Sequence, residues 1–115
     1  MSATSSTHAL PTIDDAAFAM EVGPGTGVVA VEFTAAWCAP CRLMAPLVEA
    51  AARDYAGRMR IVQLDTDANP RTMARLGVRG VPTMLVFRDG TLVDRIVGAV
   101  SQSTLRERLD RIVAA

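Results

Sequence analysis

Two cysteines stand three positions apart in the stretch AWCAPCR, residues 36–42, and the chain of 115 residues contains no other cysteine. A Cys-x-x-Cys pair in a protein of this size is typical of redox chemistry or of metal binding. Structural zinc takes four ligands, and the only other soft ligand is His8, near the N-terminus. The pair therefore favours a dithiol that cycles with a disulfide, while a metal or iron–sulfur site shared between two chains stays open.

The two sulfurs are expected to differ in reactivity. Cys38 follows a predicted buried strand and directly precedes a predicted helix, where free backbone N–H groups and the helix dipole favour a thiolate. We expect this electropositive, partly exposed position to lower the pKa of Cys38. Cys41 lies one turn further on, inside the helix, where it should be more shielded. Cys38 would then attack a disulfide in another molecule, and Cys41 would resolve the mixed disulfide and close the bond Cys38–Cys41. The alternative is a pair of buried structural cysteines.

The surrounding pattern predicts the elements that position the pair. The segment 28–34, VVAVEFT, is β-branched and almost wholly apolar, as expected of a strand buried on both faces. Apolar residues then recur at helical spacing over 41–55, and a second strand follows at 60–65, so these elements form a βαβ unit with parallel strands. The remaining predicted elements are helices at 14–22 and 69–76, the latter with Asn69 as N-cap, strands at 81–87 and 91–98, and a helix at 101–114. The order predicts a mixed sheet with helices on both faces.

Glu32 is the only charged residue in the strand 28–34. Burial of an unpaired carboxylate is costly, so we expect a raised pKa and a neutral side chain at pH 7. Carboxyl groups perturbed in this way near a reactive centre are candidates for proton transfer. A structural acid that is hydrogen-bonded in the core is the alternative.

Composition excludes several classes of function. Twelve basic residues balance twelve acidic ones without a basic patch, which argues against a nucleic-acid partner. No apolar run is long enough to span a membrane, and the first ten residues lack the features of a secretory signal. We expect a flexible leader at 1–12, a single domain at 13–115, and a cytoplasmic location.

The motif WCAPC after VAVEFTAA, followed further along by GVRGVPTMLVFRDG, resembles the thioredoxin family. The resemblance runs from about residue 13 to the end of the chain. It implies the α/β thioredoxin fold, a central mixed five-stranded sheet flanked by four helices, with an additional short first strand near residues 8–11. It also implies a monomeric protein-disulfide reductase without a bound cofactor or metal, whose substrates are oxidised proteins and whose electron donor is thioredoxin reductase.

The resemblance assigns roles near the cysteines. Cys38 matches the nucleophile of the family and Cys41 its resolving cysteine. Trp37 matches the tryptophan that shields the pair, although core packing is an equally good interpretation. The resemblance places Ala39 and Pro40, between the two cysteines, on the substrate-binding surface.

Further matches lie on the loop before the third predicted strand. Pro82 matches the cis-proline of the family, which faces the disulfide and lets the backbone at Val81 pair with an extended substrate segment. Gly80 and Gly98 match glycines that keep this surface open, although ordinary turn residues would also explain them.

The acid of the family is matched by Glu32, and its role is to help deprotonate the resolving cysteine through water. Three residues depart from the family pattern. Glu32 replaces an aspartate, Gln63 replaces a lysine on the next strand, and Ala39 replaces a glycine. Without the lysine, we expect burial to raise the pKa of Glu32 with little to oppose it.

A redox-inactive chaperone or binding module with the same fold is the alternative function.

Overall fold

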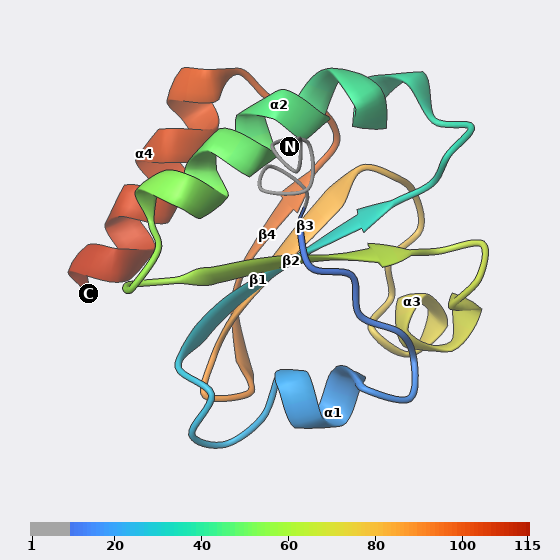
Figure 1. Ribbon diagram of the computed structural model, residues 1–115, viewed down its shortest axis with the longest axis horizontal. Helices are drawn as coiled ribbons and strands as arrows, with labels where there is room; N and C mark the ends of the chain where they lie inside the picture. Colours follow the sequence, from blue (N-terminus) through green and yellow to red (C-terminus); the bar gives the residue numbers. More distant parts are fainter. Residues whose placement is uncertain (1–9) are drawn as a thin grey trace, which may run out of the picture.

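The computed structural model describes residues 10–115 and shows a four-stranded sheet in the order β2-β1-β3-β4. Helices α2 and α4 cover one face of this sheet, and the short helices α1 and α3 lie on the other (Figure 1). In chain order the elements are α1 (Phe18–Glu21), β1 (Val28–Thr34), α2 (Ala39–Asp54), β2 (Arg60–Asp65), α3 (Pro70–Arg75), β3 (Thr83–Arg88), β4 (Thr91–Val97) and α4 (Gln102–Ala114). The chain has the thioredoxin fold predicted above.

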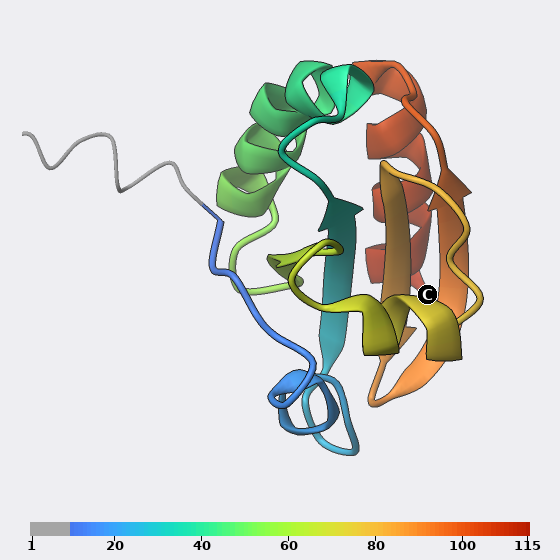
Figure 2. The same cartoon turned by 90° about the vertical axis from the view of Figure 1, so that its right-hand side faces the viewer.

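Strand β1 lies inside the sheet and joins the parallel part to the antiparallel part. It pairs in parallel with β2 and antiparallel with β3, and β3 pairs antiparallel with β4. The parallel β1–β2 pair is connected by α2, which confirms the predicted βαβ unit. The C-terminal end of β1 lies below the start of α2 (Figure 2). The cysteine pair at the start of α2 therefore lies close to the end of this strand.

Two hydrophobic clusters, one on each face, fix the position of β1 within the molecule. Alternate residues of the strand point to opposite faces: Ala30 packs with residues of α2 and α4, whereas Val31 and Phe33 pack with residues of α1 and with Val78. All five central residues of β1 are buried. The prediction of a strand buried on both faces is therefore confirmed.

The prediction of a five-stranded sheet is wrong for the described residues. The described part of the N-terminal segment makes a single parallel bridge between Thr12 and Gln63 at the outer edge of β2, and no fifth strand forms within residues 10–115. Two backbone hydrogen bonds make this bridge, from Ile13 to Gln63 and from Gln63 to Pro11. Pro11 has no N–H with which to extend the ladder. Positions 8 and 9 of the predicted strand lie outside the described residues.

Other boundaries also differ from the predictions. Helix α1 is a single turn rather than two turns. Asn69 precedes α3, but its side chain does not cap it. The cap comes instead from Asp15, whose carboxylate accepts hydrogen bonds from the backbone N–H groups of Arg71 and Thr72 at 3.1 and 2.8 Å. Asn69 accepts a hydrogen bond from the Asp15 backbone N–H, so the two residues tie α3 to the N-terminal segment.

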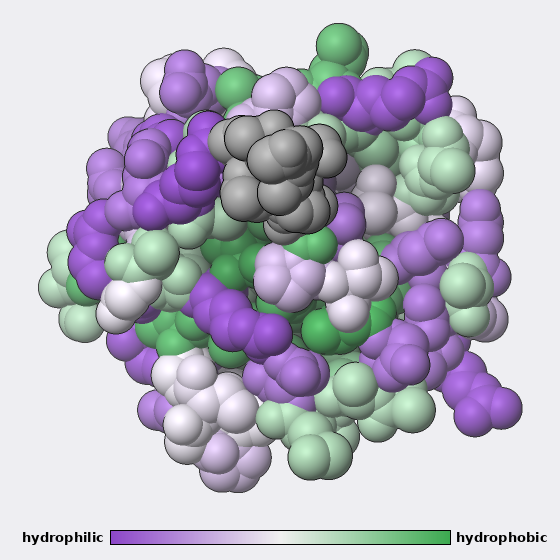
Figure 3. Space-filling model, viewed as in Figure 1, coloured by the Kyte–Doolittle hydropathy of each residue, from purple (hydrophilic) through white to green (hydrophobic). Residues whose placement is uncertain are grey.

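Hydrophilic side chains gather over α4 in the view of Figure 3. The exposed face of α2 is mixed, since it includes Ala39, Pro40 and Leu43 beside charged residues. Among residues 10–115, no helix is both long and apolar enough to cross a membrane.

Candidate active site

Cys38 is the N-cap of α2. Its backbone is extended, with φ −88° and ψ 107°, and its Sγ accepts a hydrogen bond from the backbone N–H of Cys41 at 3.2 Å. Pro40 lies in the first turn of the helix, where the absence of its N–H removes no helical hydrogen bond. The sequence thus places a sulfur atom where a capping oxygen usually lies, and a backbone N–H group points at it.

The two cysteines form the disulfide Cys38–Cys41, with Cα atoms 5.3 Å apart. Both residues are buried, with exposed fractions of 3% for Cys38 and 5% for Cys41. The prediction that Cys38 is partly exposed while Cys41 is shielded is therefore wrong for the disulfide form. Ala35 forms one buried cluster with the two cysteines, and Val81 packs against this cluster. The two sulfurs differ in their hydrogen bonds and position on the helix rather than in burial.

Exposed residues surround this buried disulfide. Ala39 and Pro40, between the cysteines, are exposed, and Trp37 is 67% exposed. The Trp37 Nε1–H donates to Oδ1 of Asp67 at 3.2 Å. Trp37 therefore does not pack in the core, and its ring is held at the surface beside the disulfide by a residue of the β2–α3 loop.

The loop before β3 lies against the disulfide. The Val81–Pro82 peptide bond is cis, and the Val81 carbonyl oxygen lies 3.6 Å from Cys38 Sγ. The Gly98 N–H donates to the Pro82 carbonyl at 2.8 Å, which brings Gly98 to the same place. The structure thus places Val81 against Cys38, with Gly80 and Pro82 next to it in the chain and Gly98 hydrogen-bonded to Pro82. Strand β3 begins only at Thr83, so Val81 and Pro82 lie before the strand and not within it.

Gly80 and Gly98 differ in whether the backbone conformation requires glycine. Gly98 has φ 82°, a conformation that side chains rarely adopt, so the turn itself accounts for glycine at this position. Gly80 has an ordinary φ, and a Cβ atom added there would meet no atom within 4 Å. The surface beside the disulfide is open at both positions.

Glu32 is 5% exposed and lies on the face of the sheet covered by α2 and α4. Burial raises the pKa of its carboxyl from the ordinary value of 4.5 to about 7. Within residues 10–115 no cation opposes this effect, as predicted from the absence of a lysine at position 63. Gln63 stands opposite Glu32 in the register of β1 and β2, but its amide nitrogen donates instead to Thr12 Oγ1 at 3.3 Å and to the Leu10 carbonyl at 3.4 Å.

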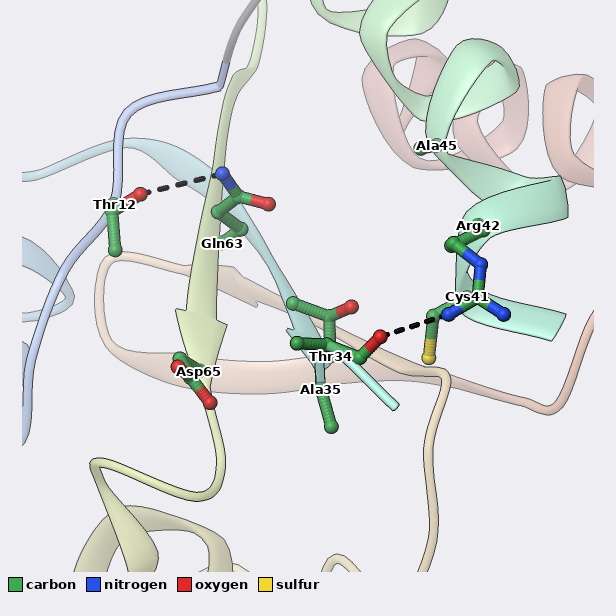
Figure 4. A pocket seen from close by; sticks show the side chains of 9 residues that line it. Thr12, Thr34, Ala35, Cys41, Arg42, Ala45, Gln63 and Asp65 are labelled. Carbon is green, nitrogen blue, oxygen red and sulfur yellow. Dashed lines mark hydrogen bonds between the residues drawn. The ribbon is translucent and has the colours of Figure 1, made fainter. Parts of the chain in front are cut away.

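A cavity of about 440 Å³ opens beside Cys41, between the C-terminal ends of β1 and β2 and the first turns of α2 (Figure 4). Its polar walls include Gln63, Asp65 and Arg42. The Arg42 guanidinium donates to the Ala36 carbonyl at 2.8 Å and so bridges the loop that carries Trp37. The cavity is large enough for several water molecules, and Cys41 is one of the residues that line it.

A metal centre finds no support in the described part of the chain. Residues 10–115 contain no group of three or more His, Cys, Asp or Glu side chains placed to hold a metal ion. His8 lies outside the described residues.

Comparison with known proteins agrees with this geometry. The thioredoxin family model matches residues 9–111. Thioredoxin from Synechocystis sp. is 41% identical over 103 residues, which cover 90% of this chain and 96% of that protein. Thioredoxin from Pseudomonas aeruginosa is 41% identical over 98 residues, which cover 85% and 91% of the two chains. The chain belongs to the thioredoxin family. Together with the bonded Cys38–Cys41 pair, family membership identifies it as a thiol–disulfide oxidoreductase.

Three polar residues of this thioredoxin site were not found from the sequence. Asp67 binds Trp37, Arg42 binds the Ala36 carbonyl, and Thr83 binds the Gly80 carbonyl. Each is a common residue type at an unremarkable position, and its role depends on which loop lies opposite in the fold. A signal existed only for Arg42, which directly follows Cys41 and so lies within reach of the loop before the helix.

Proposed function

We propose that this chain reduces disulfide bonds in other proteins, with Cys38 as the attacking sulfur and Cys41 as the resolving sulfur. The observation that supports the order of attack is the position of Cys38 as N-cap, with the Cys41 N–H directed at its sulfur. A backbone N–H stabilises a thiolate at this position when the pair is reduced. Cys41 lies within the helix and has no corresponding role as a cap.

In the first step, the Cys38 thiolate attacks one sulfur of a substrate disulfide. A new bond joins Cys38 to that sulfur, the substrate S–S bond breaks, and the released substrate thiolate takes a proton from solvent. In the second step, the Cys41 thiolate attacks Cys38 Sγ and displaces the remaining substrate sulfur. Two electrons have then moved from the dithiol to the substrate, and the chain holds the Cys38–Cys41 disulfide.

Glu32 is proposed to accept the proton of Cys41 before the second step. Burial raises the pKa of its carboxyl to about 7, which suits a group that must both accept and release a proton near neutral pH. The cavity beside Cys41 is also lined by Gln63, which stands opposite Glu32 in the sheet. Water in this cavity would carry the proton between Cys41 and the interior of the sheet.

The substrate would bind over the exposed surface that surrounds the disulfide. Trp37, Ala39 and Pro40 supply exposed contact area on one side. On the other side, Val81 would pair its backbone with an extended substrate segment, as in strand addition, while Pro82 holds the loop and Gly80 and Gly98 leave the approach open.

The family suggests the other components of the reaction. Oxidised proteins would be the substrates, thioredoxin reductase would return electrons to the Cys38–Cys41 disulfide, and the chain would act as a cytoplasmic monomer without a bound cofactor. We also propose that residues 13–115 form the single catalytic domain, preceded by a leader at 1–12. Leu10, in that leader, is 9% exposed and packs in the core, and truncation tests this boundary.

Reduction of insulin by dithiothreitol, followed by turbidity, tests this function. The wild-type chain should accelerate the reaction, and Cys38→Ser should abolish the acceleration. A redox-inactive chaperone or binding module would give no acceleration with either protein. Metal analysis of the purified protein tests the alternative of a metal site shared between two chains, which requires bound metal and a dimer.

A further inference from the structure

The substrate-facing loop Gly80–Pro82 has few contacts that fix its backbone. Gly80 is exposed and has no side chain, and Val81 is only half-buried. Besides the contact between the Val81 carbonyl and Cys38, two hydrogen bonds hold the loop among the described residues. One is the backbone bond from Gly98 to Pro82, at 2.8 Å. The other comes from the hydroxyl of Thr83, which donates to the Gly80 carbonyl at 2.8 Å.

Thr83 stands on a rigid part of the sheet. It is the first residue of β3, is 3% exposed, and is paired with Phe33 of β1 on one side and with Val97 of β4 on the other. A loop tied to this side chain takes its position from three strands at once. The Thr83 hydroxyl and the Gly98 N–H hold the loop at its two ends, so that Val81 between them faces the disulfide.

We propose that Thr83 is a positioning residue that fixes the Gly80–Pro82 backbone for pairing with an extended segment of a protein substrate. The inference rests on the proposed function, because it concerns how a polypeptide disulfide is presented to Cys38. A small disulfide has no peptide backbone to pair with Val81 and does not need the loop in one conformation. Loss of the Thr83 hydroxyl should therefore weaken the reaction with polypeptide disulfides and leave the reaction with small disulfides unchanged.

The effect should be moderate because only one hydrogen bond is involved. Removal of the hydroxyl leaves the Gly80 carbonyl on an exposed residue, where water can replace the lost donor, so the fold should survive. The loop then gains conformational freedom that each substrate must remove again on binding. One net hydrogen bond corresponds to about a three- to tenfold increase in KM for a protein disulfide.

The test compares Thr83→Val with Thr83→Ser in two reactions. Steady-state reduction of insulin gives KM and kcat, and stopped-flow reduction of 5,5′-dithiobis(2-nitrobenzoic acid) by the reduced protein gives the rate with a small disulfide. Thr83→Val should raise KM for insulin about three- to tenfold with kcat and the small-disulfide rate unchanged, and Thr83→Ser should restore KM. Thr66→Val is a matched control, because Thr66 is also buried and donates to a backbone carbonyl, that of Thr34. It should leave both reactions unchanged.

The proposal is overturned if Thr83→Val behaves as wild type with insulin, or if it slows both reactions equally, as general loss of structure would. If Thr83→Val does not fold, Thr83→Ala and Thr83→Ser give the same comparison, and equal KM values for these two variants overturn the proposal. Failure of the wild-type chain to reduce insulin would instead refute the proposed function. The backbone order parameter of Val81, from ¹⁵N relaxation, would then decide the role of Thr83: it must fall in Thr83→Val and not in Thr66→Val.

Discussion

The buried carboxyl of Glu32 should make the stability of the protein depend on pH. Its pKa is about 7 in the folded protein, whereas an exposed glutamate has the ordinary value of 4.5. The folded state therefore binds this proton more tightly than the unfolded state does. It follows that the free energy of unfolding decreases as the pH rises from 4.5 to about 7 and stays at the lower level above that range.

The interval between these two pKa values sets the size of the change in the free energy of unfolding. One pKa unit corresponds to about 1.4 kcal/mol, so an ionised Glu32 costs the folded state about 3 kcal/mol at pH 8. This value is a large fraction of the free energy of unfolding of a domain of this size. Glu32→Gln removes the titration and keeps a side chain of similar shape. The variant should therefore gain about 3 kcal/mol relative to wild type between pH 4 and pH 8.

Urea unfolding of the oxidised proteins at pH 4, 6 and 8 measures this difference. The oxidised form is suitable because disulfide-bonded cysteines do not titrate. Glu107→Gln is the matched control for the loss of a carboxylate, since Glu107 is exposed on α4. A difference for Glu32→Gln that is flat with pH would refute the reasoning, because it would mean that Glu32 ionises alike in both states.

Three further predictions concern other parts of the site and fold. Cys41→Ser should accumulate the mixed disulfide with a substrate protein, which non-reducing electrophoresis detects; rapid turnover by this variant would contradict the resolving role. Asp67→Ala removes the partner of Trp37 and should lower its fluorescence anisotropy, whereas unchanged anisotropy would show that other contacts hold the ring. Although burial opposes it, hydrogen bonds from Thr72 and Arg71 lower the pKa of Asp15. Asp15→Ala should therefore destabilise the protein at pH 7. In urea unfolding, the difference in free energy of unfolding between wild type and variant should shrink below pH 3.8. An equal difference at pH 3 and pH 7 would show that the cap does not depend on the Asp15 charge.

The elements around the cysteine pair were predictable because their signals are local. The predicted strands at 28–34 and 60–65 have the same bounds as β1 and β2. A run of β-branched residues and a helical repeat of apolar residues both act over a few neighbours. The raised pKa of Glu32 was predictable for the same reason, since a single acid in an apolar strand has no local partner.

Features that depend on distant segments were not predictable. The cap of α3 comes from Asp15, which lies more than fifty positions earlier, and nothing in the sequence around Pro70 indicates it. The same holds for the Trp37–Asp67 hydrogen bond and for the packing of Val81, from the loop before β3, against the cluster that contains Cys38. The order of elements predicts that these segments meet, but not which side chains bind to each other.

The expected difference between the two sulfurs rests on one of its two predicted causes. The sequence predicted that both the helix N-terminus and partial exposure distinguish Cys38 from Cys41, but both residues are buried in the disulfide form. The remaining distinction is the N-cap position of Cys38 and the N–H that its sulfur accepts. Capping groups act on charge without requiring exposure, so the proposed order of attack does not need an exposed sulfur in the oxidised state.

Alkylation of the reduced protein by iodoacetamide, followed site by site with mass spectrometry across pH 5 to 10, tests this order most directly. We predict that Cys38 reacts first and reaches half its maximal rate well below about 8.5, the ordinary pKa of a free cysteine, while Cys41 reacts slowly at neutral pH. Equal rates at both cysteines, with the pH dependence of free cysteine, would contradict the proposed priming of Cys38.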